Sequence, residues 1–273
     1  MKTNKIAEIT KELENGVKEV FTSEKYLNWL NTLSKFHNYS LNNTILIARQ
    51  NPNATHVAGF AAWKSKFDRH VKKGEKAIKI LAPCPIKKET INEKGETEEI
   101  TKTFFKAVSV FDIAQTEGKE LPNPITELTE NVKNFDVILE ALKKVSPVKV
   151  IFGEPENKNA KGCFNYQTQE ITIKSGMNDA QTIKTLIHEI AHAKLHNCID
   201  TENELTRNEK EVQAESVAYT VSKYFNINTE NYSFAYVAGW SKNKEIKELK
   251  KSMEIIKTTA DEIITDIEKQ IAA

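Results

Sequence analysis

The stretch KTLIHEIAHAKLHN, residues 184–197, constrains this chain more than any other, because it places three histidines at intervals of four. Residues four apart on an α-helix differ by about 40° in azimuth and stack one turn above another. His188 and His192 can therefore direct their rings at one ion, and two neutral imidazoles suit zinc. Glu189 borders the same face, where a carboxylate can act as general base on a metal-bound water. The stretch predicts a helix with a catalytic metal site.

The alternative is an ordinary core or solvent-facing helix on which the histidines fall by chance. The apolar residues around the motif argue against it, because they predict a helix that is mostly buried. A histidine or glutamate buried there without a partner would cost several kcal/mol. The metal interpretation is therefore the stronger one.

A catalytic zinc usually has three protein ligands and one open position. One candidate for the third ligand is His196, but it lies about 80° around the helix axis from His188. The other candidates are acids of the next predicted helix, about 203–225: Glu204, Glu209, Glu211 and Glu215. Glu211 and Glu215 share a face, so one can bind metal while the other orients a histidine. The alternative is a solvated charged face.

The charge of the chain is divided unevenly. Residues 1–88 carry a net charge of +9 and residues 89–273 a net charge of −8, and 49–88 hold ten basic and two acidic residues. Aromatic residues interleave with these cations, a combination that holds single-stranded nucleic acid. The alternatives are that Trp63 and Phe67 are core residues and that the lysines form a plain solvated face. The expected DNA contacts are Tyr39, Trp63, Lys64, Lys66, Arg69, Lys72, Lys73 and Lys76.

The apolar pattern predicts an α+β protein of two domains. Helices at about 1–34, 40–51 and 59–67 precede a small antiparallel sheet that includes AIKIL and KTFFKAVSVF. We expect this domain to span 1–118, with a proline-containing linker at 119–131. A second domain, 132–240, should hold short strands at 148–152, 161–166 and 170–174 before the motif helix. A long helix, 241–273, should end the chain.

The sequence gives no sign of a membrane protein. It has no run of 18 apolar residues, and its charged start, MKTNKIAEITKELENG, lacks an apolar signal core. We therefore expect a cytoplasmic protein. The oligomeric state does not follow from the sequence.

The combination LIHEIAHAKLH and EVQAESVAY resembles the ImmA/IrrE-type metallopeptidase domain, a zincin in which a downstream Glu completes the metal site. This resemblance implies that Glu211 is the third zinc ligand and that Glu215 supports a ligand histidine. Related sequences often have a Glu where this chain has Gln213, which leaves Glu211 and Glu215 open as alternatives. It also implies that the strand at 169–174 is an edge strand to which a peptide substrate can add.

The patterns KFHNYSLNN, VKKGEKAIKILAP and VSVFDIAQTEGKELP resemble the N-terminal domain of ArdC-like antirestriction proteins of mobile elements. The resemblance implies single-stranded DNA binding, adds Asn43 as a contact, and implies protection of entering DNA from restriction, as in conjugation. Two other hypotheses remain at this point. One is a regulatory metallopeptidase that cleaves a repressor-like protein, and the other is a DNA-binding protein with a structural zinc.

Overall fold

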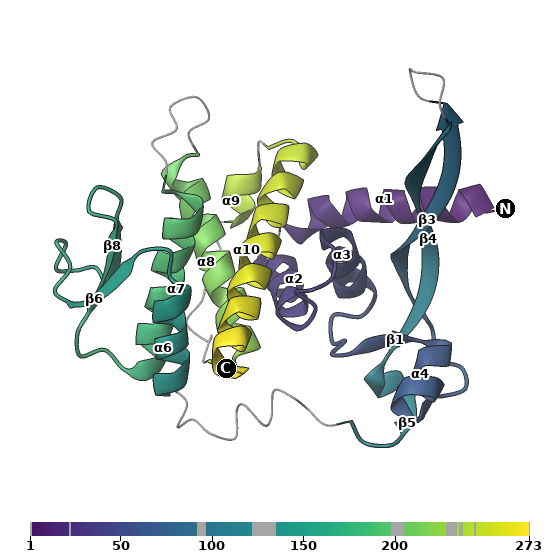
Figure 1. The fold of residues 1–273 in the computed structure, drawn as a ribbon, viewed down its shortest axis with the longest axis horizontal. Coiled ribbons are helices and arrows are strands. Elements are labelled where there is room, and N and C mark those ends of the chain that lie inside the picture. The colour runs from purple at the N-terminus through teal and green to yellow at the C-terminus, as the bar shows by residue number, and fades with distance from the viewer. Residues whose placement is uncertain are drawn as a thin grey trace. The chain divides into compact units, whose positions relative to one another are not determined.

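In the computed structural model of the chain, the described residues are 2–21, 23–91, 97–121, 135–197, 205–227, 234, 237–242 and 244–272. They form two compact units, one from residues 1–16 and 42–121 and the other from residues 17–41 and 122–273. Both units mix helices with small sheets (Figure 1), which confirms the predicted α+β class. None of the helices in these ranges is long and apolar enough for a membrane crossing.

The first unit combines helices with two small antiparallel sheets. The larger sheet has the strand order β1-β4-β3, and the smaller one pairs β2 with β5. The elements are α1 (Lys2–Val20, of which residues 2–16 belong here), α3 (Leu41–Gln50), β1 (Val57–Gly59), α4 (Phe60–Phe67), β2 (Arg69–Val71), β3 (Ile78–Ile91), β4 (Thr97–Asp112), the 3-10 helix η1 (Ile113–Gln115) and β5 (Thr116–Gly118). The helices at the predicted positions are confirmed.

Strand β3 is much longer than the expected strand at AIKIL. The amide of Asn43 on α3 both donates to Leu81 O and accepts from Leu81 N, at 2.9 Å each, so this edge of β3 faces α3 rather than β4. Backbone directions alternate along a strand. Pro83 and Pro85 therefore also face away from β4, where a missing N–H removes no ladder hydrogen bond. The strand consequently continues to Ile91 through both prolines.

The second unit places a three-stranded sheet beside a group of helices. Its elements are α2 (Ser23–Lys35), α6 (Phe135–Val145), β6 (Lys149–Gly153), β7 (Gly162–Asn165), β8 (Glu170–Lys174), α7 (Asp179–Leu195), α8 (Arg207–Tyr224), α9 (Val237–Ser241) and α10 (Ile246–Ala272). Strand β8 lies between β6 and β7 and is parallel to β6. The expectation that 169–174 is an edge strand is wrong, and β7 is the edge strand that lies against α7.

Residues 17–41 belong to the second unit, in contrast to the predicted domain limit at 118. Helix α2 packs on α8, where Tyr26 and Ser216 form a buried hydrogen bond of 2.8 Å and Tyr219 OH donates to Asn31 Oδ1 at 2.7 Å. Helix α10 packs on α6 and α8 and buries Ile263 and the other apolar residues on the same helix face. The C-terminal helix is therefore part of the second unit. From residue 122 on, the predicted linker lies outside the described residues, as do Cys198 and Glu204.

Candidate metal centre

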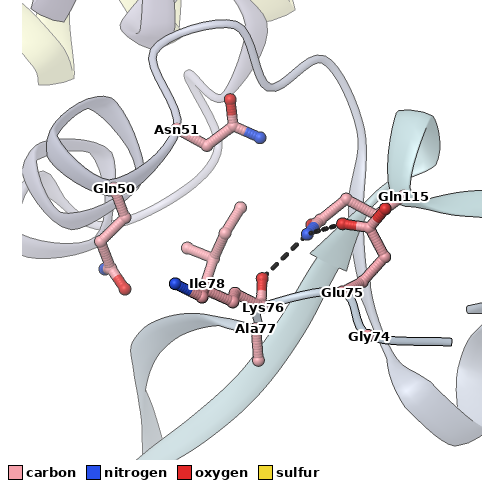
Figure 2. A pocket seen from close by; sticks show the side chains of 8 residues that line it. All are labelled: Gln50, Asn51, Gly74, Glu75, Lys76, Ala77, Ile78 and Gln115. Carbon is pink, nitrogen blue, oxygen red and sulfur yellow. Dashed lines mark hydrogen bonds between the residues drawn. The ribbon is translucent and has the colours of Figure 1, made fainter. Parts of the chain in front are cut away.

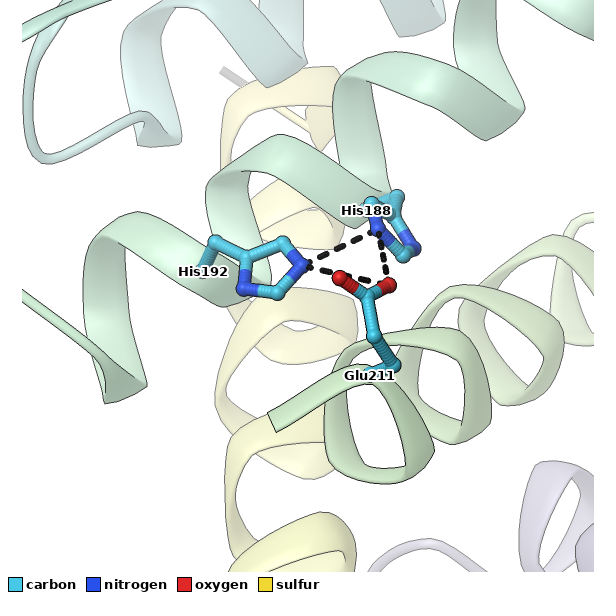
Figure 3. A group of neighbouring side chains, drawn as sticks. All are labelled: His188, His192 and Glu211. Atoms are coloured by element: carbon cyan, nitrogen blue, oxygen red, sulfur yellow. Dashed lines mark hydrogen bonds and ion pairs between the residues drawn. The ribbon is translucent and has the colours of Figure 1, made fainter. Parts of the chain in front are cut away.

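Helices α7 and α8 bring together the two motif histidines and one glutamate (Figure 3). The Nε2 atoms of His188 and His192 are 3.0 Å apart, and Glu211 Oε2 lies 3.5 Å from the first and 3.8 Å from the second. The start of α7 is fixed locally, because the side chain of Asn178 accepts from Gln181 N. The geometry places three potential ligands around one point.

The structure gives Glu211 and Glu215 different positions at His188. Glu211 faces Nε2, the nitrogen that also faces His192, whereas Glu215 Oε2 lies 3.1 Å from Nδ1 on the other side of the ring. Glu215 is also 3.6 Å from Lys184 Nζ. An imidazole that binds metal through one nitrogen commonly donates its other N–H to a carboxylate. The positions fit Glu211 as a ligand and Glu215 as the residue that orients His188.

The two imidazoles and one carboxylate form a donor set that fits a divalent metal ion. One atom each from His188, His192 and Glu211 lies within 4.8 Å of the others. Two imidazole nitrogens and a carboxylate oxygen are the ligand set of many catalytic zinc sites, which keep a further position open. The second ring nitrogen of His188 lies 3.1 Å from Glu215 Oε2 and that of His192 lies 2.9 Å from His196 Nδ1, so Nε2 of each ring is directed toward the common point.

The protonation of the metal-free site is strongly coupled. Burial alone would lower the pKa of His188, but Glu211, Glu215 and Glu189 together raise it to about 10. In return, His188 and His192 hold the pKa of Glu211 well below its usual range. Without a metal, the cluster is therefore held together as an ion pair between His188 and the acids around it.

Glu189 is buried beside these ligands, with 8% of its surface exposed. Its Oε2 atom accepts the backbone N–H of Phe164 on β7 at 2.8 Å. Burial raises the pKa of the carboxyl group, although His188 and His192 oppose the shift. A carboxylate that is less acidic than usual is a better proton acceptor near neutral pH. The fixed orientation and the raised pKa suit the predicted role as general base.

His196 and Gln213 complete the surroundings of His192. His196 Nδ1 lies 2.9 Å from His192 Nδ1, and His196 Nε2 lies 3.2 Å from Gln213 Oε1. Burial lowers the pKa of His196 to about 4. Gln213 Nε2 in turn donates to Ser252 Oγ on α10 at 3.2 Å. Thus His196 is a neighbour of a ligand, as expected, and Gln213 belongs to the same chain of contacts.

The five lysines predicted to contact DNA are all exposed in the first unit. Two of them, Lys64 and Lys66, lie on α4, and the others are Lys72, Lys73 and Lys76 around the turn at Gly74. Gly74 has a φ of 90°, a conformation that favours glycine. The turn thereby presents three cations on a short segment. Contact with DNA remains a prediction for these residues.

Trp63 and Asn43 do not offer the contacts that the sequence suggested. Trp63 is 0% exposed, and its indole N–H donates to Phe111 O at 2.9 Å. Asn43 is 8% exposed, and its amide binds the backbone of Leu81 in both directions. Neither side chain has a free face for a base, so both DNA-contact predictions are wrong. Trp63 and Phe67 pack together with ring centroids 5.1 Å apart, as the core alternative predicts.

Arg69 and Tyr39 are also engaged within the protein. The guanidinium of Arg69 donates to Thr116 Oγ1 at 2.8 Å and to Thr116 O at 3.0 Å, and so joins β2 to β5. Tyr39 belongs to the second unit, with its ring against Phe36. Arg69 therefore has a structural role in its unit, and Tyr39 does not belong to the cationic surface of the first unit.

A pocket of about 570 Å³ lies beside the Gly74 turn (Figure 2). The amide of Gln115 donates to Lys76 O at 2.8 Å and to Glu75 Oε2 at 3.0 Å, which fixes one wall. The lining residues are Gln50, Asn51, Gly74, Glu75, Lys76, Ala77, Ile78 and Gln115. The ammonium group of Lys76 has no ion-pair partner among the described residues, so it is available to an anion.

Two family models match the chain. The N-terminal domain of anti-restriction factor ArdC matches residues 2–111, and the IrrE N-terminal-like domain of the M78 peptidases matches residues 144–262. The second match assigns the unit that holds the histidine cluster to a metallopeptidase family. The two domains occur in this order in one chain, and the chain is an ArdC-like protein. This confirms the resemblance drawn from the sequence.

The fold is similar to that of antirestriction protein ArdC from plasmid R388. The Mn(II)-bound crystal structure matches with a TM-score of 0.57 at 17% identity and covers 95% of this chain and 98% of that one. The metal-free crystal structure matches with a TM-score of 0.51 at 17% identity, covering 86% and 85%. An uncharacterized Bacillus anthracis protein, pXO2-81, is 29% identical over 314 aligned positions and covers 98% of this chain. The chain spans about half (52%) of the length of that relative.

Proposed function

We propose that this chain is an antirestriction protein of a mobile element, which acts in the cytoplasm. The first unit binds single-stranded DNA and the second is a zinc-dependent peptidase that acts on a protein or peptide substrate. The order of the two domain matches supports the proposal, as does the likeness to a plasmid-encoded ArdC. The proposed biological function is to protect DNA that enters a cell during conjugation.

The observation that carries the peptidase half is the convergence of His188, His192 and Glu211 beside the buried Glu189. These three ligands would hold zinc, which supplies an activated water and polarises a peptide carbonyl. Glu189 takes the proton from the attacking water, since burial raises its pKa and makes it a stronger base. The N–H of Phe164 holds Oε2 in place, so that Oε1, which accepts no hydrogen bond from the described residues, can receive the proton.

The substitution Glu189→Gln tests the chemistry. It keeps the shape of the side chain and removes the base, so the variant should retain bound zinc while peptide hydrolysis falls by at least about 100-fold. Zinc content is measured by mass spectrometry of the purified protein, and hydrolysis with a library of labelled peptides. Hydrolysis that persists in the variant would show that Glu189 is not the base. Zinc that remains bound while wild type cleaves no peptide would favour a structural metal.

The DNA half rests on the exposed lysines of the first unit. Lysine side chains neutralise phosphates and release counterions, so binding should weaken steeply as salt increases. Fluorescence anisotropy of the full chain with a labelled single-stranded oligonucleotide and with the matching duplex, in 50 and 200 mM salt, tests this directly. The expected result is tighter binding to the single strand. No binding at the lower salt concentration would end the DNA half of the proposal and leave a regulatory peptidase as the better account.

A further inference from the structure

The paired strands β3 and β4 extend as a two-stranded ribbon, which we define as residues 82–88 and 100–106. Figure 1 shows β3 and β4 as a long hairpin of the first unit. Phe104 is 53% exposed, Phe105 55% and Ile86 51%. Phe104 and Ile86 share one face of the ribbon and Phe105 lies on the other. Exposed apolar side chains that share a face can mark an interaction site. The sequence predicted only that KTFFKAVSVF forms a strand of the antiparallel sheet.

The register of the ribbon combines an aromatic ring with cations on one face. Phe104 pairs with Cys84, and side chains two residues apart on a strand share a face. Lys102 and Lys106 therefore flank Phe104 along β4, and Lys88 lies on the same face of β3. The ribbon contains four lysines and no acidic residue. Of the four, Lys87 is paired with Glu99 at 2.6 Å, while no described residue forms an ion pair with the other three.

We infer that this face of the ribbon binds single-stranded DNA, with a base stacked on Phe104 and phosphates held by Lys102 and Lys106. The inference rests on the DNA-binding function proposed above and assigns it a contact surface. Charge complementarity selects the occupant, because three unpaired cations and no acids suit a polyanion. The aromatic ring suits an unpaired base, since every base offers a π-face for stacking. Pro83 and Pro85 at the outer edge of β3 disfavour a protein strand as the partner there.

The test uses the full chain and a fluorescent single-stranded oligonucleotide. Phe104→Ala should weaken binding about 10-fold, the typical effect of losing one stacked base. Its salt dependence should stay unchanged, because no phosphate contact is lost. The double substitution of Lys102 and Lys106 by Ala should lower the steepness of the salt dependence by about 1.4, at about 0.7 for each single-strand phosphate contact. The matched control is Phe152→Ala, which removes a 43% exposed phenylalanine from β6 in the other unit.

The outcomes separate this inference from the function on which it rests. If wild type binds and Phe104→Ala binds as tightly as Phe152→Ala, the ribbon is not the contact surface, although the DNA-binding function stands. If wild type does not bind, both are wrong. If Phe104→Ala instead dissociates an oligomer in light scattering and leaves DNA affinity unchanged, the ribbon is an interface between copies. Circular dichroism confirms the fold of each variant.

The contacts of His192 Nδ1 with His196 and, through it, with Gln213 support a second, independent inference. A histidine that binds metal through Nε2 has its proton on Nδ1, so His192 Nδ1–H must donate to His196 Nδ1 at 2.9 Å. His196 then has its own proton on Nε2, which donates to Gln213 Oε1 at 3.2 Å. Ser252 holds the opposite end of that amide, because Gln213 Nε2 donates to its hydroxyl. With a metal on His192 Nε2, this arrangement gives every donor in this series of contacts an acceptor.

The geometry points to His196 and Gln213 as positioning residues that fix the tautomer of His192. The two ligand histidines are thus held differently, His188 by the carboxylate of Glu215 and His192 by a neutral imidazole. Helix α10 contributes through Ser252, which links the C-terminal helix to the metal centre. Gln213 gains a specific role in this arrangement, because it links His196 to Ser252.

Two measurements test the second inference. Nitrogen-15 histidine spectra of the zinc-loaded protein should show His192 protonated at Nδ1 and His196 at Nε2. His196→Phe and Gln213→Met should each lower zinc affinity about 10-fold, as loss of an outer hydrogen-bond partner does. Lys194→Ala, on the same helix, is the control and should bind zinc like wild type. The inference is wrong if His192 has its proton on Nε2 in the zinc-loaded protein, or if both variants keep full affinity and the tautomer of His192.

Discussion

The backbone N–H of Phe164 donates to Oε2 of Glu189 across 2.8 Å, and this bond ties the edge strand β7 to the helix that carries the metal ligands. The N–H of Phe164 points away from β8, because it donates to Glu189 rather than to the sheet. Gly162, two positions earlier on β7, also lies close to Glu189. The close approach of β7 to α7 therefore sets the position of Glu189.

The first prediction concerns that approach. A Cβ atom at Gly162 would lie 2.6 Å from Thr185 Cγ2 and 3.1 Å from Glu189 Cγ. Gly162→Val should therefore force β7 away from α7 and lower the free energy of unfolding by about 1–3 kcal/mol. Thermal unfolding of the two variants measures the effect. Gly153→Val on β6 is the control, because a Cβ there meets nothing within 4 Å. Equal stability of both variants would contradict the packing argument.

The second prediction separates the two glutamates of α8. Glu211 faces both Nε2 atoms, whereas Glu215 faces Nδ1 of His188 alone. Glu215→Gln should lower zinc affinity by roughly 10- to 100-fold, as expected for a partner that only orients a ligand. Glu211→Gln should lower it further, because a ligand is lost. Competition titration with a zinc-binding dye compares the two, and each substitution removes one charge. A larger loss for Glu215→Gln would exchange the assignments.

Local pattern was sufficient to predict that His188 and His192 lie together, since their spacing depends on helix geometry alone, whereas Glu211 was implied by the family resemblance. His188 and His192 are one turn apart on α7, and Glu211 lies on the next helix, so few long-range contacts are involved. Local pattern alone allowed two alternatives for Trp63, a contact with DNA or a place in the core. On α4 it shares a face with Phe67, while Lys64 and Lys66 face solvent. The choice between core and surface depended on what covers that face, here strand β4 with Phe111 O.

Two features that the sequence did not predict depend on partners that are not neighbours in the chain. An amphipathic α2 does not reveal that its partner is Ser216, 190 residues away. The central place of β8 depends on a parallel partner, β6, that precedes it by about twenty residues. The ribbon carried a usable signal, because adjacent residues on a strand point to opposite faces. Phe104 and Phe105 therefore could not both be covered by a single layer.

The third prediction concerns alkaline pH. Burial and the neighbouring Glu268, whose carboxylate accepts a hydrogen bond from the hydroxyl, raise the pKa of Tyr224 above its usual value. Above pH 10 the unfolded chain loses this proton while the folded chain keeps it. Unfolding then releases a proton, so this stability is present below pH 10 and is lost as pH rises, by at most about 1.4 kcal/mol per pH unit. Solvent screening reduces the slope, because the side chain is only half-buried.

Tyr224→Phe removes the titrating group and should make the free energy of unfolding fall less steeply between pH 10 and 12. Urea titrations at several pH values measure the slope. Tyr166→Phe, which removes an exposed hydroxyl, is the matched control and should follow wild type. Parallel pH profiles for wild type and Tyr224→Phe would show that the hydroxyl and Glu268 do not contribute in this range.

The fourth prediction tests the lysines around the Gly74 turn separately from the ribbon. Replacing Lys72, Lys73 and Lys76 together by Ala should weaken single-stranded DNA binding and lower the steepness of its salt dependence by about 2, at about 0.7 per phosphate contact. A variant with Lys247, Lys250 and Lys251 of α10 replaced by Ala loses the same charge from an exposed face in the other unit. That control should bind like wild type. Equal weakening in both variants would mean that net charge alone, and not a surface of the first unit, governs the affinity.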